Sequence, residues 1–255
     1  MKVRELFEQL EKIIPPALSM EWDNDGLMVS ADPERELTRA LVSLDATHEV
    51  VEYAVDNGFD LILTHHPLIF KGLNSVNPDA PVPQKVIKCV QYGITVMSFH
   101  TRLDVLDGGV NDALAYILGL KNVVKYGELM RVGELDWLMA AEDFAELVRE
   151  SLGCDYVNYV GGHDVKKVAL VGGDGKDYYK DALQSGADVY LTGSLNYNMM
   201  VEAAEEKMNV VEAGHFYTEH PVCKVLANTL TDLGLPAEIF YCNPVATLMS
   251  DNFVE

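Results

Sequence analysis

The chain has 255 residues, of which 49% are apolar, so it can bury the core of one large domain or of two small ones. Nineteen Lys and Arg against 40 Asp and Glu give a formal charge of −21, which argues against binding to nucleic acids or to anionic membrane surfaces. Four scattered cysteines without a C-x-x-C pair favour the reduced cytoplasm, and no apolar stretch approaches the roughly 18 residues that span a bilayer.

The first half of the chain is predicted to begin with a helix and to continue with buried strands. Apolar residues recur at helical spacing over residues 6–14, with acidic residues between them, which indicates an amphipathic helix and not a signal peptide. Apolar runs over residues 40–45, 61–64 and 94–99 predict strands. Residues 78–83 contain three prolines and are expected to form a surface loop.

The second half repeats this alternation of helices and strands. One helical stretch ends near Gly119, and the boundary between the halves is expected near residues 121–130. A helix is predicted over residues 139–152. Further apolar runs predict strands over residues 168–173, 189–192 and 209–214.

An internal duplication relates the two halves. Residues 54–64 match residues 182–192, and both segments end in a Gly-x-Asp-x-x-Leu-Thr pattern. Strands that alternate with helices imply βαβ crossovers. We therefore expect an α/β fold of two similar, intertwined, three-layer α/β/α lobes with mostly parallel or mixed sheets. Residues 1–125 with 210–255 would form the first lobe, which carries the candidate ligands, and residues 126–209 the second.

Histidines gather at the ends of three predicted strands, where open α/β sheets place their ligand crevices. His65 and His66 directly follow the strand over residues 61–64. A His-x-x-x-acid motif follows each of two other strands, as His100 to Asp104 and as His215 to Glu219. With His220 included, five of the seven histidines lie at these strand ends, which points to a bound metal.

Each motif alone also has a structural interpretation. A His-His pair can cap a strand or satisfy hydrogen bonds in a core, and His-x-x-x-acid at helical spacing is an ordinary i,i+4 pair. If the strand ends of both halves meet, however, one site collects His65, His66, Asp104, His215 and Glu219. Imidazole and carboxylate suit Zn, Fe, Mn, Co or Ni, and five ligands suffice for two ions that share a carboxylate. Such a pair typically activates water for hydrolysis.

Two other motifs are less specific. Residues 172–175 (Gly-Gly-Asp-Gly) follow a strand and have the composition of a phosphate cradle, but they lack the complete nucleotide-binding signatures and favour a tight turn. Residues 22–26 (Trp-Asp-Asn-Asp-Gly) have the composition of a turn, and the alternative places Asp23 or Asn24 near the site.

Four segments together resemble the Nif-three-like dinuclear metal-centre family, whose members are often called GTP cyclohydrolase I type 2 homologues. They are Trp-Asp-Asn-Asp-Gly-Leu over residues 22–27, Thr-His-His-Pro-Leu-Ile-Phe-Lys over 64–71, the stretch from His100 to Asp112, and Gly-His-Phe-Tyr-Thr-Glu over 214–219. The resemblance runs in order along nearly the whole chain.

The resemblance implies a toroidal homohexamer of two-lobed subunits with a two-metal site in each. By matching motif positions, the metal ligands would be His65, His66, Asp104, His215 and Glu219. His100 lies inside a family motif beside the site, and we expect it to transfer protons or orient the substrate, with metal ligation as the alternative. The chain departs from the family pattern at Ser194 and Asn198, where relatives usually have an acidic residue and a histidine. Contacts to substrate from that strand end are therefore in question.

Two functions are expected from these features. The first is a two-metal hydrolase that acts on a small molecule, for which the family name implies a nucleotide opened at its purine ring. The second is a non-catalytic metal-binding ring that stores, delivers or senses metal or serves as a scaffold. No phosphate-binding motif accompanies the metal ligands, and the charge of −21 does not attract a triphosphate.

Overall fold

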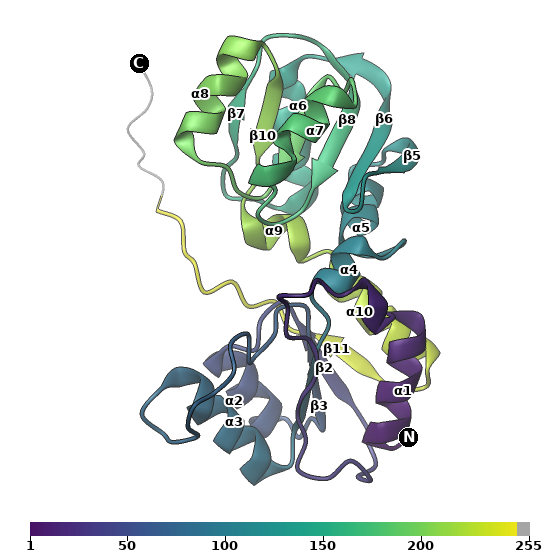
Figure 1. The fold of residues 1–255 in the computed structure, drawn as a ribbon, viewed down its shortest axis with the longest axis vertical. Helices are drawn as coiled ribbons and strands as arrows, with labels where there is room; N and C mark the ends of the chain where they lie inside the picture. Colours follow the sequence, from purple (N-terminus) through teal and green to yellow (C-terminus); the bar gives the residue numbers. More distant parts are fainter. Residues whose placement is uncertain (249–255) are drawn as a thin grey trace.

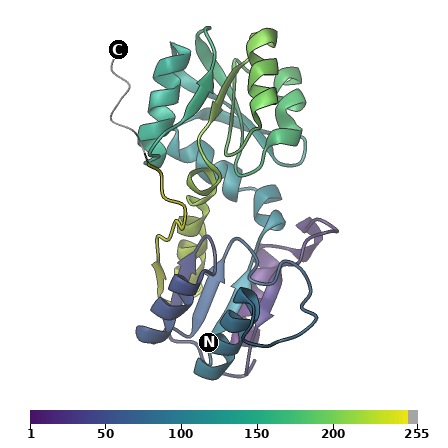
Figure 2. The ribbon, with the colours of Figure 1, turned by 90° about the vertical axis from the view of Figure 1, so that its left-hand side faces the viewer.

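The computed structural model describes residues 1–248, which form two α/β lobes joined by a narrow middle (Figure 1, Figure 2). The chain builds most of the first lobe, crosses into the second, and returns to add the last strand of the first sheet. The predicted fold class is therefore confirmed. Among the described residues, no helix combines the length and the apolar character that crossing a membrane requires.

The first lobe contains a five-stranded sheet with the order β1-β4-β3-β2-β11. Its strands are β1 (Gly26–Val29), β2 (Ala40–Ser43), β3 (Leu61–Thr64), β4 (Thr95–Ser98) and β11 (Ala237–Ile239). Strand β1 is antiparallel to β4, and all other neighbours are parallel. The helices of this lobe are α1 (Val3–Ile13), a 3-10 helix (Pro16–Leu18), α2 (His48–Asp56), α3 (Pro81–Tyr92), α4 (Thr101–Val105) and α10 (Val222–Asp232).

Helices cover both faces of this sheet, as the apolar sequence of its central strand requires. Leu61 and Leu63 of β3 pack in the cluster that includes α1 and α10. Ile62, between them, points to the opposite face and packs in the cluster that includes α2 and α3. Because side chains alternate along a strand, an uninterrupted apolar run fills both interfaces at once.

The second lobe contains a six-stranded sheet with the order β5-β6-β8-β9-β10-β7. Its strands are β5 (Lys121–Tyr126), β6 (Met130–Met139), β7 (Asn158–Val160), β8 (Val165–Val171), β9 (Val189–Thr192) and β10 (Asn209–Glu212). Its helices are α5 (Val110–Ile117), α6 (Ala141–Leu152), a 3-10 helix (Lys176–Tyr178), α7 (Tyr179–Gln184) and α8 (Tyr197–Glu206). Helices α5 and α6 cover one face, and α7 and α8 cover the other.

The duplication inferred from the sequence is visible in the strand register. Ser43 of β2 lies opposite Thr64 of β3, and Val171 of β8 lies opposite Thr192 of β9, so the same pairing recurs 128 residues later. In the first sheet the next parallel strand is β4, and its outer neighbour is the antiparallel edge strand β1. In the second sheet the next parallel strand is β10, and its outer neighbour is the antiparallel edge strand β7. The copies differ on the other side, where β11 extends the first sheet and the β5-β6 hairpin extends the second.

The repeated aspartate has the same task in both copies. Asp60, just before β3, accepts a hydrogen bond from the backbone N–H of Thr38 at 2.8 Å. Asp188, just before β9, accepts one from the backbone N–H of Lys167 at 2.7 Å. Asp60 thereby ties the start of β3 to the segment before β2, and Asp188 ties the start of β9 to the first residues of β8. The shared Gly-x-Asp pattern is therefore a structural feature of the fold.

The lobe boundaries differ from those expected. The breaks at 125/126 and 209/210 fall inside β5 and β10, and both strands belong to the second sheet. Strand β10 pairs with β9 and β7, so its backbone hydrogen bonds are satisfied there. The chain returns to the first lobe only after α9 (His215–Glu219), a short helix between the lobes (Figure 1).

The proline-rich segment is only partly a loop, so the prediction for residues 78–83 was wrong at its end. Helix α3 begins at Pro81, and Pro83 is buried in its first turn. Proline is tolerated in a first helical turn because the N–H groups there have no partner within the helix. The helix predicted over residues 139–152 begins at Ala141, because Met139 still pairs in β6.

Candidate metal centre

The structure brings all six candidate site residues together between the lobes. His65 and His66 follow β3, whereas His100 follows β4 and directly precedes α4, which carries Asp104. Helix α9 follows β10 and carries His215 and Glu219 one turn apart. Strands β3 and β4 are parallel neighbours, so their carboxyl ends meet at one edge of the first sheet. Helix α9 approaches this edge from the second lobe (Figure 1).

His65 is fully buried and oriented by the backbone. Its Nδ1 donates a hydrogen bond to the Phe99 carbonyl oxygen at 3.0 Å, which leaves Nε2 as the free ring atom. Nε2 lies 3.6 Å from Asp104 Oδ1 and 3.8 Å from Glu219 Oε1. This buried nitrogen has no hydrogen-bond partner within residues 1–248. A buried, unpartnered ring nitrogen that faces two carboxylates fits a cation ligand.

His66 and His215 converge on the second oxygen of the same glutamate. Glu219 Oε2 lies 2.9 Å from His66 Nε2 and 2.8 Å from His215 Nε2. The two histidine Nε2 atoms lie 3.4 Å apart. His66 Nδ1 donates to Asp45 Oδ1 at 2.8 Å, which fixes the ring as outer carboxylates fix metal-binding histidines.

Glu219 therefore belongs to two groups of potential ligands. One group contains His65 and Asp104 with Glu219, and the other contains His66 and His215 with Glu219. Within each group the candidate ligand atoms lie within 4.8 Å of one another. Glu219 Oε1 faces the first group and Oε2 faces the second. The sequence left open which carboxylate is shared, and this arrangement favours Glu219.

Without a bound ion, the pKa values of the Asp104 and Glu219 carboxyl groups are shifted in opposite directions. Burial, together with the negative charge of Glu219, raises the pKa of Asp104 well above its ordinary value. Burial would also raise the pKa of Glu219, but the hydrogen bonds from His215 and His66, together with the nearby imidazole of His65, outweigh it and hold that pKa well below its ordinary value. A bound cation would remove this conflict by favouring the ionised form of both groups.

His66 holds its proton tightly in the protein alone. Burial by itself would lower the pKa of His66, but hydrogen bonds to Asp45 and Glu219 raise it to about 10. The hydrogen bond to Glu219 likewise raises the pKa of His215. The proton on His66 Nε2, which points toward Glu219 Oε2, thus lies on the side of the ring where a metal would bind. Metal binding must displace this proton, because only the unprotonated nitrogen is a ligand.

His100 lies next to the paired histidines and is held by the motif over residues 22–26. Its ring centroid is 5.3 Å from that of His65 and 5.6 Å from that of His66. His100 Nδ1 donates to Asp23 Oδ1 at 2.9 Å, and Asp23 Oδ2 accepts from the hydroxyl of Thr101 at 2.6 Å. Burial opposes ionisation of Asp23, but these bonds prevail and lower its pKa. Of the two interpretations of this motif, the structure favours proximity to the site.

A buried ion pair attaches the same motif to α4. Arg102 Nη2 lies 2.7 Å from Asp25 Oδ1, and the two side chains are 4% and 3% exposed. Arg102 Nη1 also donates to the Ile14 carbonyl oxygen at 3.1 Å. Because α4 carries Asp104, this pair helps to position a candidate ligand. The sequence gives no sign that Arg102 pairs with Asp25, because this contact depends on the folded chain.

The glycine-rich turn over residues 172–175 packs directly against the candidate ligands. Gly173 has φ +67°, and a Cβ atom there would overlap Glu219 Oε1. Its backbone N–H donates to Thr218 Oγ1 at 3.0 Å, on the same helix as Glu219. The sequence favoured a tight turn here, and the structure adds that the turn supports Glu219. The missing side chain leaves room for the carboxylate.

Ser194 and Asn198, where the chain departs from the family pattern, have different surroundings. Ser194 lines a cavity of about 250 Å³ beside His215, together with residues that include Tyr156 and Asn243. Asn198 lies exposed in the first turn of α8. Ser194 is therefore positioned to influence what binds next to His215.

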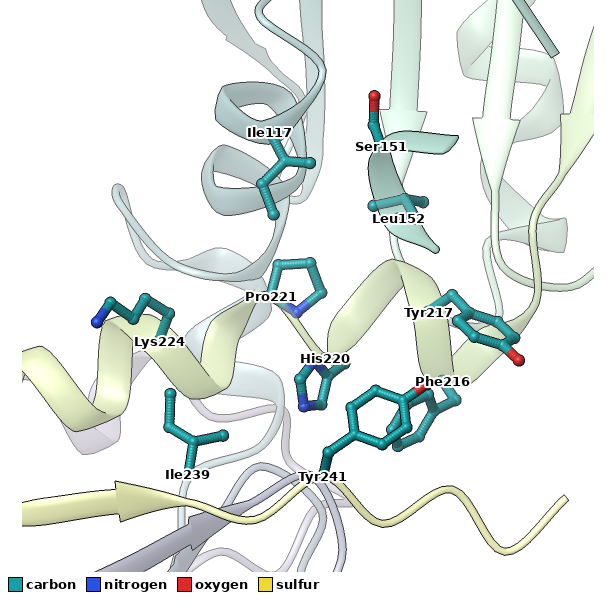
Figure 3. A pocket seen from close by; sticks show the side chains of 10 residues that line it. All are labelled: Ile117, Ser151, Leu152, Phe216, Tyr217, His220, Pro221, Lys224, Ile239 and Tyr241. Carbon is teal, nitrogen blue, oxygen red and sulfur yellow. The ribbon is translucent and has the colours of Figure 1, made fainter. Parts of the chain in front are cut away.

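A separate cavity of about 270 Å³ lies where α5, α6, α9, α10 and β11 approach one another (Figure 3). His220 lines it and packs against the rings of Phe216 and Tyr241, at centroid distances of 5.1 and 4.8 Å. Burial lowers the pKa of His220. His220 thus belongs to the aromatic packing behind the metal centre.

The fold and the site define a two-lobed α/β protein with a histidine and carboxylate cluster, suited to a metal ion, between its lobes. Residues 1–243 match the model of the family described as Duf34/NIF3 (NGG1p interacting factor 3), and the chain belongs to this family. The resemblance seen in the sequence is therefore confirmed.

Known relatives match nearly the full length of the chain. A protein of Clostridium perfringens named GTP cyclohydrolase 1 type 2 homolog is 36% identical over 232 residues, which cover 87% of this chain and 88% of the relative. The crystal structure of Staphylococcus aureus protein SA1388 superposes with a TM-score of 0.87 at 28% identity and covers 100% of this chain and 99% of its own. Reduced HcgD from Methanocaldococcus jannaschii has a TM-score of 0.80 at 29% identity, with 94% and 97% covered.

Proposed function

We propose that this chain is a dinuclear-metal hydrolase in which Glu219 bridges two divalent transition-metal ions. His65 and Asp104 would complete the ligands of one ion, and His66 and His215 those of the other. The observation that carries the proposal is the buried Glu219 carboxylate, whose two oxygens face two different sets of ligands. Imidazole with carboxylate suits Zn, Fe, Mn, Co or Ni.

The donor set fits such ions because the ring orientations are already fixed. Hydrogen bonds from Nδ1 hold His65 on the Phe99 carbonyl and His66 on Asp45, and they direct both Nε2 atoms toward the shared carboxylate. Two bound ions would supply a water of lowered pKa and a positive clamp for the oxygens of the substrate.

His100 is the proposed proton-transfer or substrate-orienting group. Its Nδ1–H is committed to Asp23, so Nε2 is the atom free to exchange a proton with water or substrate. One ligand atom of His100 lies within 4.8 Å of ligand atoms of His65 and His66, so a role as an additional ligand remains its second assignment.

The proposed substrate is a small molecule, and the name of the Clostridium perfringens relative suggests GTP, opened at its purine ring by water. We also propose that the chain forms the homohexamer that the family resemblance implies. Sedimentation equilibrium would test this, since a mass near six times 28.2 kDa is expected and a monomer contradicts it.

Non-catalytic metal storage or delivery is the second candidate function. The observation in its favour is restricted access, because the side chains of His65, Asp104 and Glu219 are only 0%, 18% and 6% exposed. Shielded ligands retain an ion well but leave less room for a substrate.

Reconstitution of the metal-free protein separates these functions. Samples loaded with Zn, Mn, Fe, Co or Ni would be assayed with GTP and with panels of phosphoesters and amides, and metal per chain measured by elemental analysis. We expect two ions per chain, turnover with at least one substrate, and, in His65→Ala, loss of turnover together with about one ion per chain. His163→Ala, which removes an exposed histidine outside the cluster, is the matched control. Two bound ions without any turnover favour the storage function, whereas turnover retained in His65→Ala contradicts the hydrolase mechanism.

A further inference from the structure

Two large aromatic side chains beside the candidate metal centre are exposed. Trp22 is 64% exposed and Phe70 is 45% exposed. Their ring centroids lie 6.2 and 6.1 Å from the ring of His100, which itself contacts the paired histidines. Exposed aromatic surface next to a cluster of polar site residues marks a place where a ligand is bound.

The two rings are held in position by the segments that build the site. Trp22 directly precedes Asp23, which accepts the hydrogen bond from His100. Phe70 lies four residues after His66, and the Asn24 side chain donates to the backbone carbonyl of Ile69. The loops that carry the aromatic rings are thus tied to each other and to the metal centre.

The contacts between the rings leave most of the Trp22 side chain exposed. Trp22 and Phe70 contact each other edge to face, with centroids 6.1 Å apart and planes inclined by 70°. Such contacts orient the rings but cover little of the indole. Aromatic residues that serve only as packing in this chain, such as Phe99 and Phe144, are 0% exposed. The exposed indole face therefore has the character of a stacking surface.

We propose that Trp22 and Phe70 form a subsite that stacks a planar heteroaromatic ring of purine size, so that the rest of the ligand extends past His100 toward the metal centre. The assignment of this ring to the substrate rests on the proposed function. A π face binds a ring without requiring positive charge, which suits a protein with a formal charge of −21 that repels phosphates over long range.

Tryptophan fluorescence reports on this subsite directly, because the chain contains only two tryptophans, Trp22 and Trp137. In Trp137→Phe the emission comes from Trp22 alone. We expect guanosine and GTP to quench it on the metal-loaded protein, while tripolyphosphate, which lacks a ring, leaves it unchanged. In Trp22→Phe, where only Trp137 on β6 remains, guanosine should cause no saturable quenching. Equal quenching by tripolyphosphate, or none by guanosine, overturns the proposal.

Calorimetric titration of guanosine measures the contribution of the indole. Trp22→Ala is expected to weaken guanosine binding about 5- to 150-fold, the range for loss of one base-stacking contact, and Trp22→Phe by no more than about threefold. Trp137→Ala, which removes an indole that is 66% exposed, is the matched control and should bind normally. Unchanged affinity in Trp22→Ala, or affinity lost equally in Trp22→Phe, contradicts a stacking role.

The outcome is separable from that of the proposed function because guanosine binding requires no turnover. Metal per chain and the circular dichroism spectrum of each variant would show that the centre and the fold are intact. Guanosine binding that depends on Trp22, in a protein without hydrolase activity, supports the stacking subsite and contradicts the proposed hydrolase function. Hydrolysis of a substrate that does not quench Trp22 supports the hydrolase function and contradicts the subsite.

Discussion

Glu219 differs from every other candidate ligand because its two carboxylate oxygens face different partners. Oε1 lies near His65, and Oε2 lies within hydrogen-bonding distance of His66 and His215. Asp104 belongs to only one of the two groups. The two acidic residues are therefore expected to differ in the number of ions that depend on them.

Substitution of these carboxylates by amides tests the difference. An amide oxygen is a weaker ligand, so Asp104→Asn should reduce bound metal by about one ion per chain and Glu219→Gln by about two. Elemental analysis after exhaustive dialysis measures both, with Glu205→Gln on the exposed surface of α8 as the control. Equal losses in the two site variants would argue against a bridge through Glu219.

The proton on His66 makes metal binding depend on pH. Because hydrogen bonds to Asp45 and Glu219 raise the pKa of His66 to about 10, the metal-free protein keeps this proton at pH 7 to 9. Binding must release it, so the apparent affinity should rise with pH, by about tenfold per unit for one released proton, and level off above the raised pKa. Calorimetry in buffers of different ionisation enthalpy counts the protons released on metal binding.

The variant Asp45→Asn tests this account. Its His66 loses one of the two hydrogen-bond partners that raise the pKa, so the apparent metal affinity should stop rising at a lower pH. Identical pH profiles for the two proteins would refute this account.

At the scale of elements, the turn between β8 and the following 3-10 helix supports α9. Gly173→Ala should displace Glu219, because the new Cβ would overlap its Oε1 at a backbone φ of +67°. Gly153→Ala is a matched control, since φ is +65° there but no atom lies within 4 Å of the added Cβ. Both substitutions should cost about 1–2 kcal/mol of stability from the left-handed backbone. Only Gly173→Ala should also lose bound metal, as measured by elemental analysis beside thermal unfolding. Equal metal contents would show that the turn does not support the site.

The strands and helices that could be predicted from the sequence are those that have a clear apolar pattern within their own residues. Residues 61–64 and 189–192 are apolar and lie on central strands, so both faces are buried and the signal is strong. Strand β11 escaped prediction because Ala237–Ile239 is short and only half-buried. Strand β5, which is exposed at most positions, gave no alternation to recognise. The start of α3 at Pro81 was missed because proline marks loops and first helical turns alike.

The candidate ligands could also be found in the sequence, because each follows a strand or a recognisable motif. The residues that orient them could not. Asp45 reaches His66 only because β2 and β3 are neighbours, and Gly173 reaches Glu219 only because the second lobe packs against α9. Such supporting contacts join positions far apart in the chain. Their sequence signal, a lone acid at a strand end or a glycine-rich turn, is shared by many structural sites.

At the scale of the whole molecule, the candidate metal centre lies where the two copies of the repeat meet. The first copy supplies His65, His66 and Asp104 from around its sheet edge, and the second supplies His215 and Glu219 from the helix after its last central strand. Only the first copy retained the histidine pair, since Gly193 and Ser194 occupy the matching positions of the second. Duplication thus produced two similar frameworks around one site instead of two sites.

Strand β11 has a consequence for how the protein is made. It pairs with β2 almost two hundred positions earlier, as Ala237 with Ala40, after the intervening chain has completed the other sheet. During translation the amino-terminal sheet therefore keeps an open edge at β2 until residues 237–239 have left the ribosome. The cluster, which needs residues as distant as His65 and Glu219, cannot assemble on a shorter nascent chain. The complete set of candidate ligands is consequently available only after residue 219 has been synthesised.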